Sequence, residues 1–137
     1  SLALHGALHL VDGRAREAMV ASDAVLLASG TAALEAMLAK RPMVVAYRIA
    51  PLTYFIVKAF GLLKVERYSL PNVLAGDALV PERMQADCRA EVLADDVERL
   101  LREGLTPAQR LRFEGLHEAL HAPTPRAAAE AVASLLE

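Results

Sequence analysis

Short apolar runs alternate with segments of helical period through the first half of the sequence. A continuous apolar run bounded by turn residues is typical of a strand that is buried on both faces of a sheet. Three such runs predict strands at "ALHLV" (7–11), "AVLLA" (24–28) and "MVVAYR" (43–48). Segments with apolar residues at helical spacing follow them at 14–22, 31–40 and 51–60. The repeated strand–helix order predicts an α/β fold in which helices flank a parallel sheet.

The pattern changes after Lys64. Residues 67–82, "RYSLPNVLAGDALVPE", carry Pro, Gly, Asn and Asp in the manner of a loop-rich passage. The rest of the sequence has helical period, with Pro at or near the start of several segments, where its missing N–H would have no partner anyway. The expected helices are 81–87, 90–103, 107–121 and 125–137. We therefore expect residues 1–137 to form a single partial domain, α/β over about 1–70 and loops and helices over 71–137.

The turn after the second expected strand carries the clearest functional signal. Ligands of open parallel sheets bind at the carboxyl ends of the strands, and Ser29, Gly30 and Thr31 lie at such an end. The first N–H groups of a helix have no intrahelical partner, and the helix dipole places partial positive charge beside them. Gly30 lets the backbone turn tightly and approach a ligand, while the two hydroxyl groups add donors. The turn therefore predicts a site for a phosphate or diphosphate.

Glu35 follows Thr31 by one helical turn on the same face of the expected helix. Its carboxylate is placed to accept hydrogen bonds from a ribose diol at the helix entrance. A purely structural alternative stays open at this point. Ser and Thr are common helix caps, and an early Glu complements the helix dipole without binding any ligand.

Two further residues are weaker candidates for contact with the same ligand. Arg48 leaves its strand at the same edge of the sheet, where a planar guanidinium can bind a phosphate through two hydrogen bonds. A solvated surface arginine is the alternative. Asn72 follows Pro71 in the loop-rich passage, a position that Asn also favours because it stabilises turns.

Charge and composition limit the classes of partner and cofactor that we expect for this chain. The chain has 15 Lys and Arg against 17 Asp and Glu, a formal net charge of −2, so no basic surface predicts nucleic-acid binding. Its one cysteine, Cys88, has no partner for an internal disulfide and fits a reducing cytoplasm. His117 and His121 lie one helical turn apart without a third ligand, so we expect neither a metal site nor a cofactor.

The segment "PLTYFIVKAFGLLK" (51–64) is apolar and contains Tyr54, Phe55 and Phe60. A core helix is the simpler interpretation, because exposed apolar patches are uncommon. The alternative is contact with lipid at a membrane surface, with Lys58 and Lys64 at the level of the headgroups. No run of about 18 uncharged apolar residues occurs, so we expect no helix that crosses a bilayer.

Several blocks in a fixed order carry a resemblance to a known family. The blocks "DGRAREAM", "ASGTAALEAMLAKRPMVVAYRIAPLTY" and "YSLPNVLAGDALVPERMQADC" resemble the carboxyl-terminal part of bacterial lipid-A-disaccharide synthase, a family-19 glycosyltransferase. The resemblance runs from about Leu10 to Cys88, and the helical tail is compatible with it.

The resemblance implies a GT-B fold, in which two Rossmann-like halves enclose the active site. It implies UDP-2,3-diacylglucosamine as donor and 2,3-diacylglucosamine 1-phosphate (lipid X) as acceptor. The whole enzyme would be an inverting hexosyltransferase that forms the β-1,6 disaccharide of lipid A and releases UDP. In such enzymes the carboxyl-terminal half holds the nucleotide, generally without a divalent metal.

Carried over by position, the resemblance places Ser29, Gly30 and Thr31 at the UDP diphosphate, Glu35 at the ribose, and Asn72 near the donor. The amino-terminal half, which supplies the acceptor pocket and the catalytic base in this family, has no counterpart here. The first strand and glycine-rich turn of the donor half are missing too. We therefore expect no catalytic residue in this chain and no transfer by the chain alone.

Two alternatives remain open from the sequence. The chain resembles, more weakly, other UDP-sugar enzymes of the same architecture, such as the glycosyltransferase that makes lipid II or a UDP-sugar epimerase. A non-catalytic α/β interaction domain is the second alternative. For the family as a whole we expect a cytoplasmic enzyme at the inner face of the bacterial inner membrane, with lipid-bearing substrates and no nucleic acid.

Overall fold

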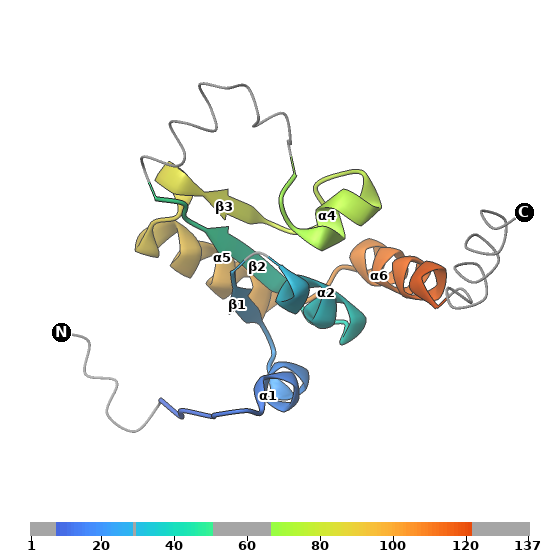
Figure 1. The fold of residues 1–137 in the computed structure, drawn as a ribbon, viewed down its shortest axis with the longest axis horizontal. Helices are drawn as coiled ribbons and strands as arrows, with labels where there is room; N and C mark the ends of the chain where they lie inside the picture. Colours follow the sequence, from blue (N-terminus) through green and yellow to red (C-terminus); the bar gives the residue numbers. More distant parts are fainter. Residues whose placement is uncertain (1–7, 29, 51–66, 122–137) are drawn as a thin grey trace, which may run out of the picture.

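The computed structural model describes residues 8–28, 30–50 and 67–121, which form a parallel sheet with helices on both faces (Figure 1). The strands are β1 (Val25–Leu27), β2 (Met43–Tyr47) and β3 (Glu82–Met84), in the spatial order β1-β2-β3. Both pairings are parallel, with Val25 opposite Met43 and Val45 opposite Glu82. The α/β class predicted from the alternating pattern is confirmed.

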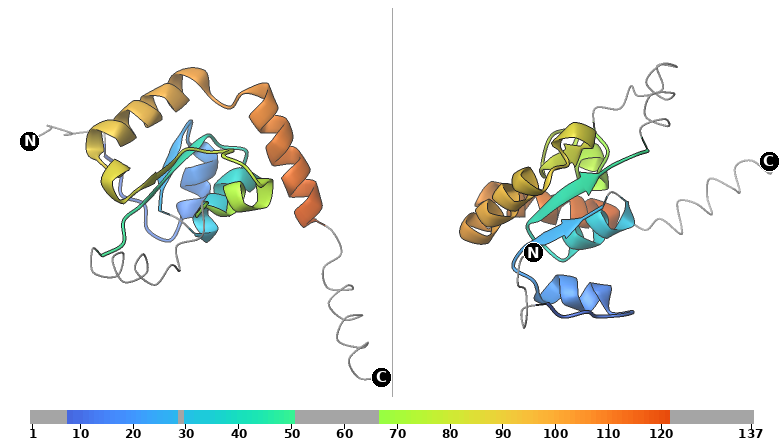
Figure 2. Two further views of the ribbon diagram at one scale, coloured as in Figure 1. Left: turned by 90° about the horizontal axis from the view of Figure 1, so that it is seen from above. Right: turned by 90° about the vertical axis from the view of Figure 1, so that its left-hand side faces the viewer.

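Strand β2 is central because its sequence is apolar on both faces. Met43, Val44 and Val45 are buried, whereas the strand end at Tyr47 is exposed. A parallel strand covered on both sides requires this near-continuous apolar run rather than an alternating one. The two faces are covered by α2 (Thr31–Leu38) and α5 (Ala90–Glu103), which Figure 2 shows on opposite sides of the sheet.

The remaining helices pack around this unit. They are α1 (Ala15–Ala21), α4 (Leu70–Ala75), the 3-10 turn η1 (Gln85–Asp87) and α6 (Pro107–Leu120). Helix α6 begins with a capping box, in which the Thr106 hydroxyl accepts from the Gln109 N–H and the Gln109 side chain accepts from the Thr106 N–H. Helix α4 begins at Ser69 in a similar way and ends at Gly76, whose left-handed backbone suits a helix C-terminus.

One hydrophobic core joins these elements. Its members come from the sheet, from α2, from the loop before β3 and from α6, and they include Met37, Met43, Val45, Val80 and Phe113. Phe113 is the largest of the fully buried side chains, so α6 is anchored to the sheet unit through this ring.

The expected strand at 7–11 is wrong over the part that the structure describes. Leu8 to Val11 has no strand conformation, and Leu10 is 92% exposed. An apolar run forms a strand only where a neighbouring strand satisfies its backbone hydrogen bonds, and none of the described strands pairs with this segment.

The expected helix at 81–87 is also wrong. Residues 82–84 form β3, because they pair with β2, and only 85–87 are helical, as the turn η1. Pro81 misled the prediction, since Pro can precede the first residue of a strand as readily as that of a helix. The passage 67–82 contains a helix, α4, where only loop was expected. The helices expected at 51–60 and 125–137 lie outside the described residues.

Candidate functional site

Gly30 links β1 to α2 and is the N-cap of that helix, with φ +127° and ψ −152°. This region of backbone conformation is open to Gly and strained for residues with a side chain. A Cβ at this position would meet nothing within 4 Å, so the space beside the turn is open. Ser29, the residue before it, lies outside the described residues.

The entrance of α2 has no side-chain cap. Gly30 has no side chain to supply one, and Thr31 is exposed and is already the first helical residue. The alternative in which Thr31 caps the helix is therefore not the arrangement found. Ala33 N–H donates to the Gly30 carbonyl at 3.2 Å, and among the described residues no side chain accepts from the helix start. Without a described side-chain cap, the earliest N–H groups of α2 are available to a ligand, and the positive end of the helix dipole lies behind them.

Glu35 is exposed, and no residue in the described ranges forms a hydrogen bond or an ion pair with its carboxylate. It lies beyond the first turn of α2, which contains no acidic residue. The dipole effect falls off within that first turn, so complementing the dipole does not account well for this carboxylate. Its oxygens are available to a ligand that reaches the helix entrance.

Arg48 lies at the same edge of the sheet as Gly30, because β1 and β2 run parallel and each residue follows the end of its strand. Its guanidinium is exposed and has no partner among the residues that the structure describes. The third strand end at this edge is Gln85, directly after β3. The sequence did not predict it, since a helix was expected at 81–87, and its one local signal, a left-handed backbone, is invisible in a sequence.

Asn72 is placed differently from these residues. It is 2% exposed, and its side chain holds the loop before β3 to α4. Its amide nitrogen donates to the Val80 carbonyl at 2.9 Å and to Glu82 Oε1 at 2.8 Å, while its Oδ1 accepts from Val80 N–H at 2.8 Å. Both amide hydrogens are therefore in use, and direct contact with a ligand would require breaking one of these bonds.

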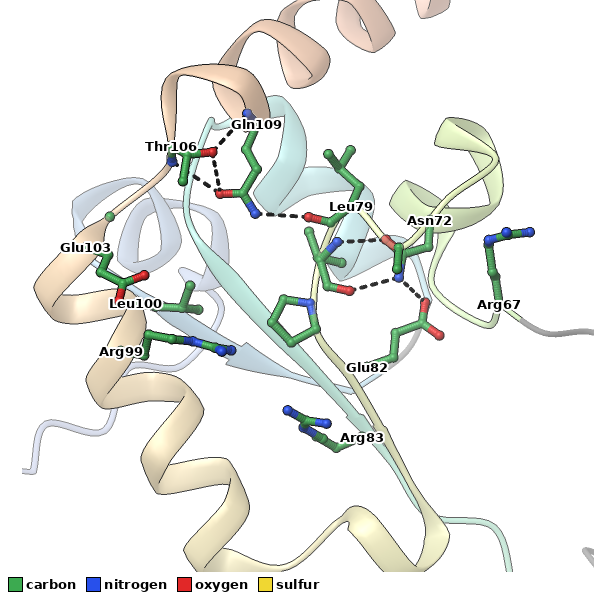
Figure 3. Close-up of a pocket in the computed structure, with 14 residues that line it drawn as sticks. Arg67, Asn72, Leu79, Glu82, Arg83, Arg99, Leu100, Glu103, Thr106 and Gln109 are labelled. Carbon is green, nitrogen blue, oxygen red and sulfur yellow. Dashed lines mark hydrogen bonds between the residues drawn. The ribbon is translucent and has the colours of Figure 1, made fainter.

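Glu82 accepts several hydrogen bonds at the start of α4, and Figure 3 shows the one from the Asn72 amide. Besides the Asn72 amide, its carboxylate accepts from the backbone N–H groups of Tyr68, at 3.1 Å, and Ser69, at 2.8 Å, and from the Ser69 hydroxyl. A carboxylate beside a helix start stabilises the unpaired N–H groups there. Asn72 and Glu82 together fix where α4 begins.

A cavity of about 800 Å³ lies beside Glu82, between the loop before β3 and the facing ends of α5 and α6 (Figure 3). Its lining includes Arg67, Asn72, Glu82, Arg83, Arg99 and Glu103. None of Gly30, Thr31, Glu35 and Arg48 borders it. Because Asn72, Glu82 and Arg83 already have partners within the protein, this cavity is a gap between packed elements and the open helix entrance is the better candidate site.

Two polar contacts away from the entrance hold elements together. Arg83 in β3 binds the buried Asp96 of α5 through two hydrogen bonds, and these bonds hold the pKa of the Asp96 carboxyl below its usual value despite its burial. Lys40 Nζ lies 2.6 Å from His117 Nδ1 and so connects the end of α2 to α6. Burial lowers the pKa of Lys40, and the nearby Glu114 carboxylate opposes that effect.

The histidines form no metal site in the ranges that the structure describes. His117 and His121 stack with ring centroids 5.4 Å apart. Over those ranges, no three or more His, Cys, Asp or Glu side chains come together in a way that could hold an ion. Over the same ranges, none of the helices has the length and apolar character to cross a bilayer.

Comparison with known proteins points to one family. The sequence model described as "Lipid-A-disaccharide synthetase" matches residues 2–134. A protein named lipid-A-disaccharide synthase in Xanthomonas oryzae pv. oryzae (strain MAFF 311018) is 56% identical over 130 residues, 94% of this chain. One of the same name in Xylella fastidiosa (strain M23) is 53% identical over 130 residues. The chain spans only 30% of the length of the first of these relatives and 34% of the second.

Proposed function

The chain belongs to the lipid-A-disaccharide synthase family, and from this premise we propose that it forms the UDP-binding part of an inverting glycosyltransferase. The complete enzyme transfers 2,3-diacylglucosamine from UDP-2,3-diacylglucosamine to 2,3-diacylglucosamine 1-phosphate and releases UDP. Residues 1–137 serve as one partial, nucleotide-binding domain. The acceptor pocket and the base that deprotonates the attacking 6-hydroxyl lie in the remainder of the enzyme, so the chain alone catalyses no transfer.

The uncapped entrance of α2 is the observation that carries this proposal. Gly30 and Thr31 lie at an open turn at the carboxyl edge of the sheet, where their N–H groups and the Thr31 hydroxyl can donate to a ligand. The preceding Ser29, outside the described residues, is assigned to the same contact from the sequence alone. When the bond between the anomeric carbon and the diphosphate breaks, negative charge grows on the leaving oxygen. Donors and a helix dipole already aimed at that point stabilise the charge without reorganising, which lowers the barrier.

The neighbouring charged residues contact other parts of the nucleotide. The Glu35 carboxylate accepts hydrogen bonds from the ribose hydroxyl groups, and its exposure and lack of a described partner support this role. Arg48 adds positive charge beside the diphosphate. Asn72 acts through α4, which packs against α2, and its bonds to Val80 and Glu82 favour this indirect role over direct contact with the donor sugar.

The location of the enzyme follows from its substrates. Both carry acyl chains, so the complete enzyme works at the inner face of the bacterial inner membrane while remaining cytoplasmic. The apolar segment 51–64, which lies outside the described residues, is the part of this chain that would contact lipid.

Titration calorimetry with UDP tests the proposed function. We expect the chain to bind UDP, and we expect Thr31→Val and Glu35→Gln each to weaken binding roughly 5- to 50-fold, because each removes one hydrogen bond to a polar or charged ligand group. The control is Glu98→Gln, an exposed carboxylate on α5 at the other face of the sheet, which should leave the affinity unchanged. Absence of UDP binding by the unaltered chain would favour a non-catalytic interaction domain instead.

A further inference from the structure

Gln85 uses its side chain to extend the pairing between β2 and β3. The last paired residues of these strands are Tyr47 and Met84. Beyond this pair, Ile49 N–H donates to Gln85 Oε1 at 2.7 Å, and Gln85 Nε2 donates to the Ile49 carbonyl at 3.3 Å. The amide group thus exchanges hydrogen bonds with one backbone residue much as a strand residue does.

The backbone of Gln85 is strained by this arrangement. Its φ of +47° lies in the left-handed region, which Gly and Asn enter more readily than Gln. Such a conformation is unfavourable for a residue with a side chain and persists only where the surroundings enforce it. Gly would relieve the strain but has no amide, and Asn is one methylene shorter. The two hydrogen bonds between its side-chain amide and the Ile49 backbone therefore explain why Gln occupies this position.

Arg48 directly precedes Ile49, the residue whose backbone Gln85 binds. Arg48 is exposed, and its guanidinium forms no hydrogen bond or ion pair with a described residue that would fix its direction. The direction of Arg48 therefore depends on the backbone at residues 48 and 49, which Gln85 holds from the position directly after β3. Strained residues cluster at functional sites, and this one lies at the carboxyl edge of the sheet with the entrance of α2.

We propose that Gln85 is a positioning residue for the diphosphate of the nucleotide: its amide fixes the backbone at Ile49 so that the Arg48 guanidinium is held toward the entrance of α2. Gln85 itself does not touch the nucleotide. This role rests on the proposed function, because it assumes that a diphosphate binds at that entrance. The structural alternative is that the amide only completes the end of the sheet.

A double-mutant cycle separates positioning from plain structural support. The chain, Gln85→Ala, Arg48→Ala and the double variant are each titrated with UDP and with uridine, which lacks the diphosphate. We expect each single variant to weaken UDP binding about tenfold, the scale of one charge-assisted interaction. The double variant should bind UDP no more weakly than Arg48→Ala alone, since both changes remove the same contact. Uridine affinity should be equal in all four proteins.

Two further variants distinguish the positioning role of Gln85 from a simple loss of folding. Gln85→Gly removes the amide and relieves the backbone strain, so it should be at least as stable to heat as Gln85→Ala while binding UDP equally weakly. Gln109→Ala is the matched control: Gln109 Nε2 also bridges two elements, donating to the Leu79 carbonyl at 3.1 Å, but lies away from the strand ends. It should lower thermal stability and leave UDP affinity unchanged.

Three results would overturn the proposal. They are unchanged UDP affinity in both Gln85 variants, equal losses of UDP and uridine affinity, or losses for Gln85→Ala and Arg48→Ala that add in the double variant. Any of these, with UDP bound by the unaltered chain, refutes the role of Gln85 and leaves the proposed function standing. Failure of the unaltered chain to bind UDP refutes both.

Discussion

Gly30 has the backbone conformation that opens α2 to solvent. With φ at +127° and ψ at −152°, it turns the chain from β1 into the helix in a way that side-chain-bearing residues resist. It also leaves the helix without a side-chain cap. The same residue therefore shapes the turn and keeps the first N–H groups of α2 accessible, and both follow from its missing side chain.

Replacing Gly30 with Ala tests this dual role. The new methyl group would meet no atom within 4 Å, so the cost comes from the backbone and not from a clash. We expect Gly30→Ala to lower the free energy of unfolding by about 1–3 kcal/mol and to weaken UDP binding, because the turn must shift.

The control for this change is Gly115→Ala, within α6, where the backbone is helical and the methyl group also meets nothing within 4 Å. Ala is the better helix former, so this variant should gain about 0.5–1 kcal/mol and bind UDP normally. Thermal unfolding and calorimetry check both variants. Equal effects of the two substitutions would contradict a special backbone requirement at Gly30.

Part of the candidate site can be predicted from single residues. Gly30, Thr31, Glu35 and Arg48 are identifiable because the carboxyl ends of parallel strands share one edge, so a sequence that shows the strands also shows the residues at their ends. Whether these residues contact UDP stays a prediction. Asn72 has a visible motif, but its bonds to Val80 and Glu82 depend on packing that spacing does not reveal.

At the scale of elements, α5 is fastened to the edge strand β3 by one ion pair. Arg83 Nε lies 2.6 Å from Asp96 Oδ2 and Arg83 Nη2 lies 2.9 Å from Asp96 Oδ1, while Arg99 Nη2 lies 2.8 Å from the same Oδ1. The Asp96 carboxyl is buried, so losing its charge would leave Arg83 without its partner.

This ion pair makes stability depend on pH in a definite direction. The hydrogen bonds from Arg83 lower the pKa of Asp96 in the folded state from an ordinary value of 3.8. The unfolded chain therefore binds the proton more readily, and the stabilisation is complete above about pH 4 and is lost as the pH falls through the folded-state pKa.

We expect Asp96→Asn to lose about 2–3 kcal/mol at pH 7, somewhat less than for a fully buried pair because Arg83 is 32% exposed. Denaturant unfolding of both proteins between pH 7 and pH 2 checks this, and the two stabilities should converge in acid. The control Asp95→Asn, an exposed neighbour on α5, should change stability by no more than about 0.5 kcal/mol. A constant gap between the curves down to pH 2 would contradict the account.

The elements differ in how well the sequence predicts them. Helices α5 and α6 and strands β1 and β2 are located nearly to the residue, because long periodic segments and buried apolar runs carry their own signal. Strand β3, "ERM", contains one apolar residue in three and exists because it pairs with β2. The apolar run 7–11 shows the converse, since its described part has the composition of a strand and no partner among the described strands. Pairing is a tertiary property.

For the whole molecule, the described sheet supplies one wall of the site that we propose for UDP. Gly30, Arg48 and Gln85 follow the carboxyl ends of three neighbouring parallel strands, so they lie at a single edge of the sheet. The relatives are about three times as long as the chain, so a ligand at this edge has room to contact further protein in the complete enzyme. Under the proposed function, nucleotide binding belongs to this chain and acceptor binding to the rest of the enzyme.

Membrane contact is proposed for the complete enzyme and is tested there. If segment 51–64 touches lipid, replacing Phe55 and Phe60 with Ser removes apolar area that would enter the headgroup region. We expect the double variant of the complete enzyme to float less with liposomes than the unaltered enzyme. Equal flotation, with transferase activity retained, would assign membrane contact to another part of the enzyme.

The binding of a diphosphate at the entrance of α2 is the central claim, and backbone amide NMR tests it most directly. UDP is added to the isotopically labelled chain, and the amide signals of Gly30, Thr31 and Ala32 are followed, with uridine as the ligand that lacks the diphosphate. The account predicts saturable shifts of these three signals with UDP and much smaller ones with uridine. If UDP binds while these signals stay in place, the diphosphate lies elsewhere and the account is wrong.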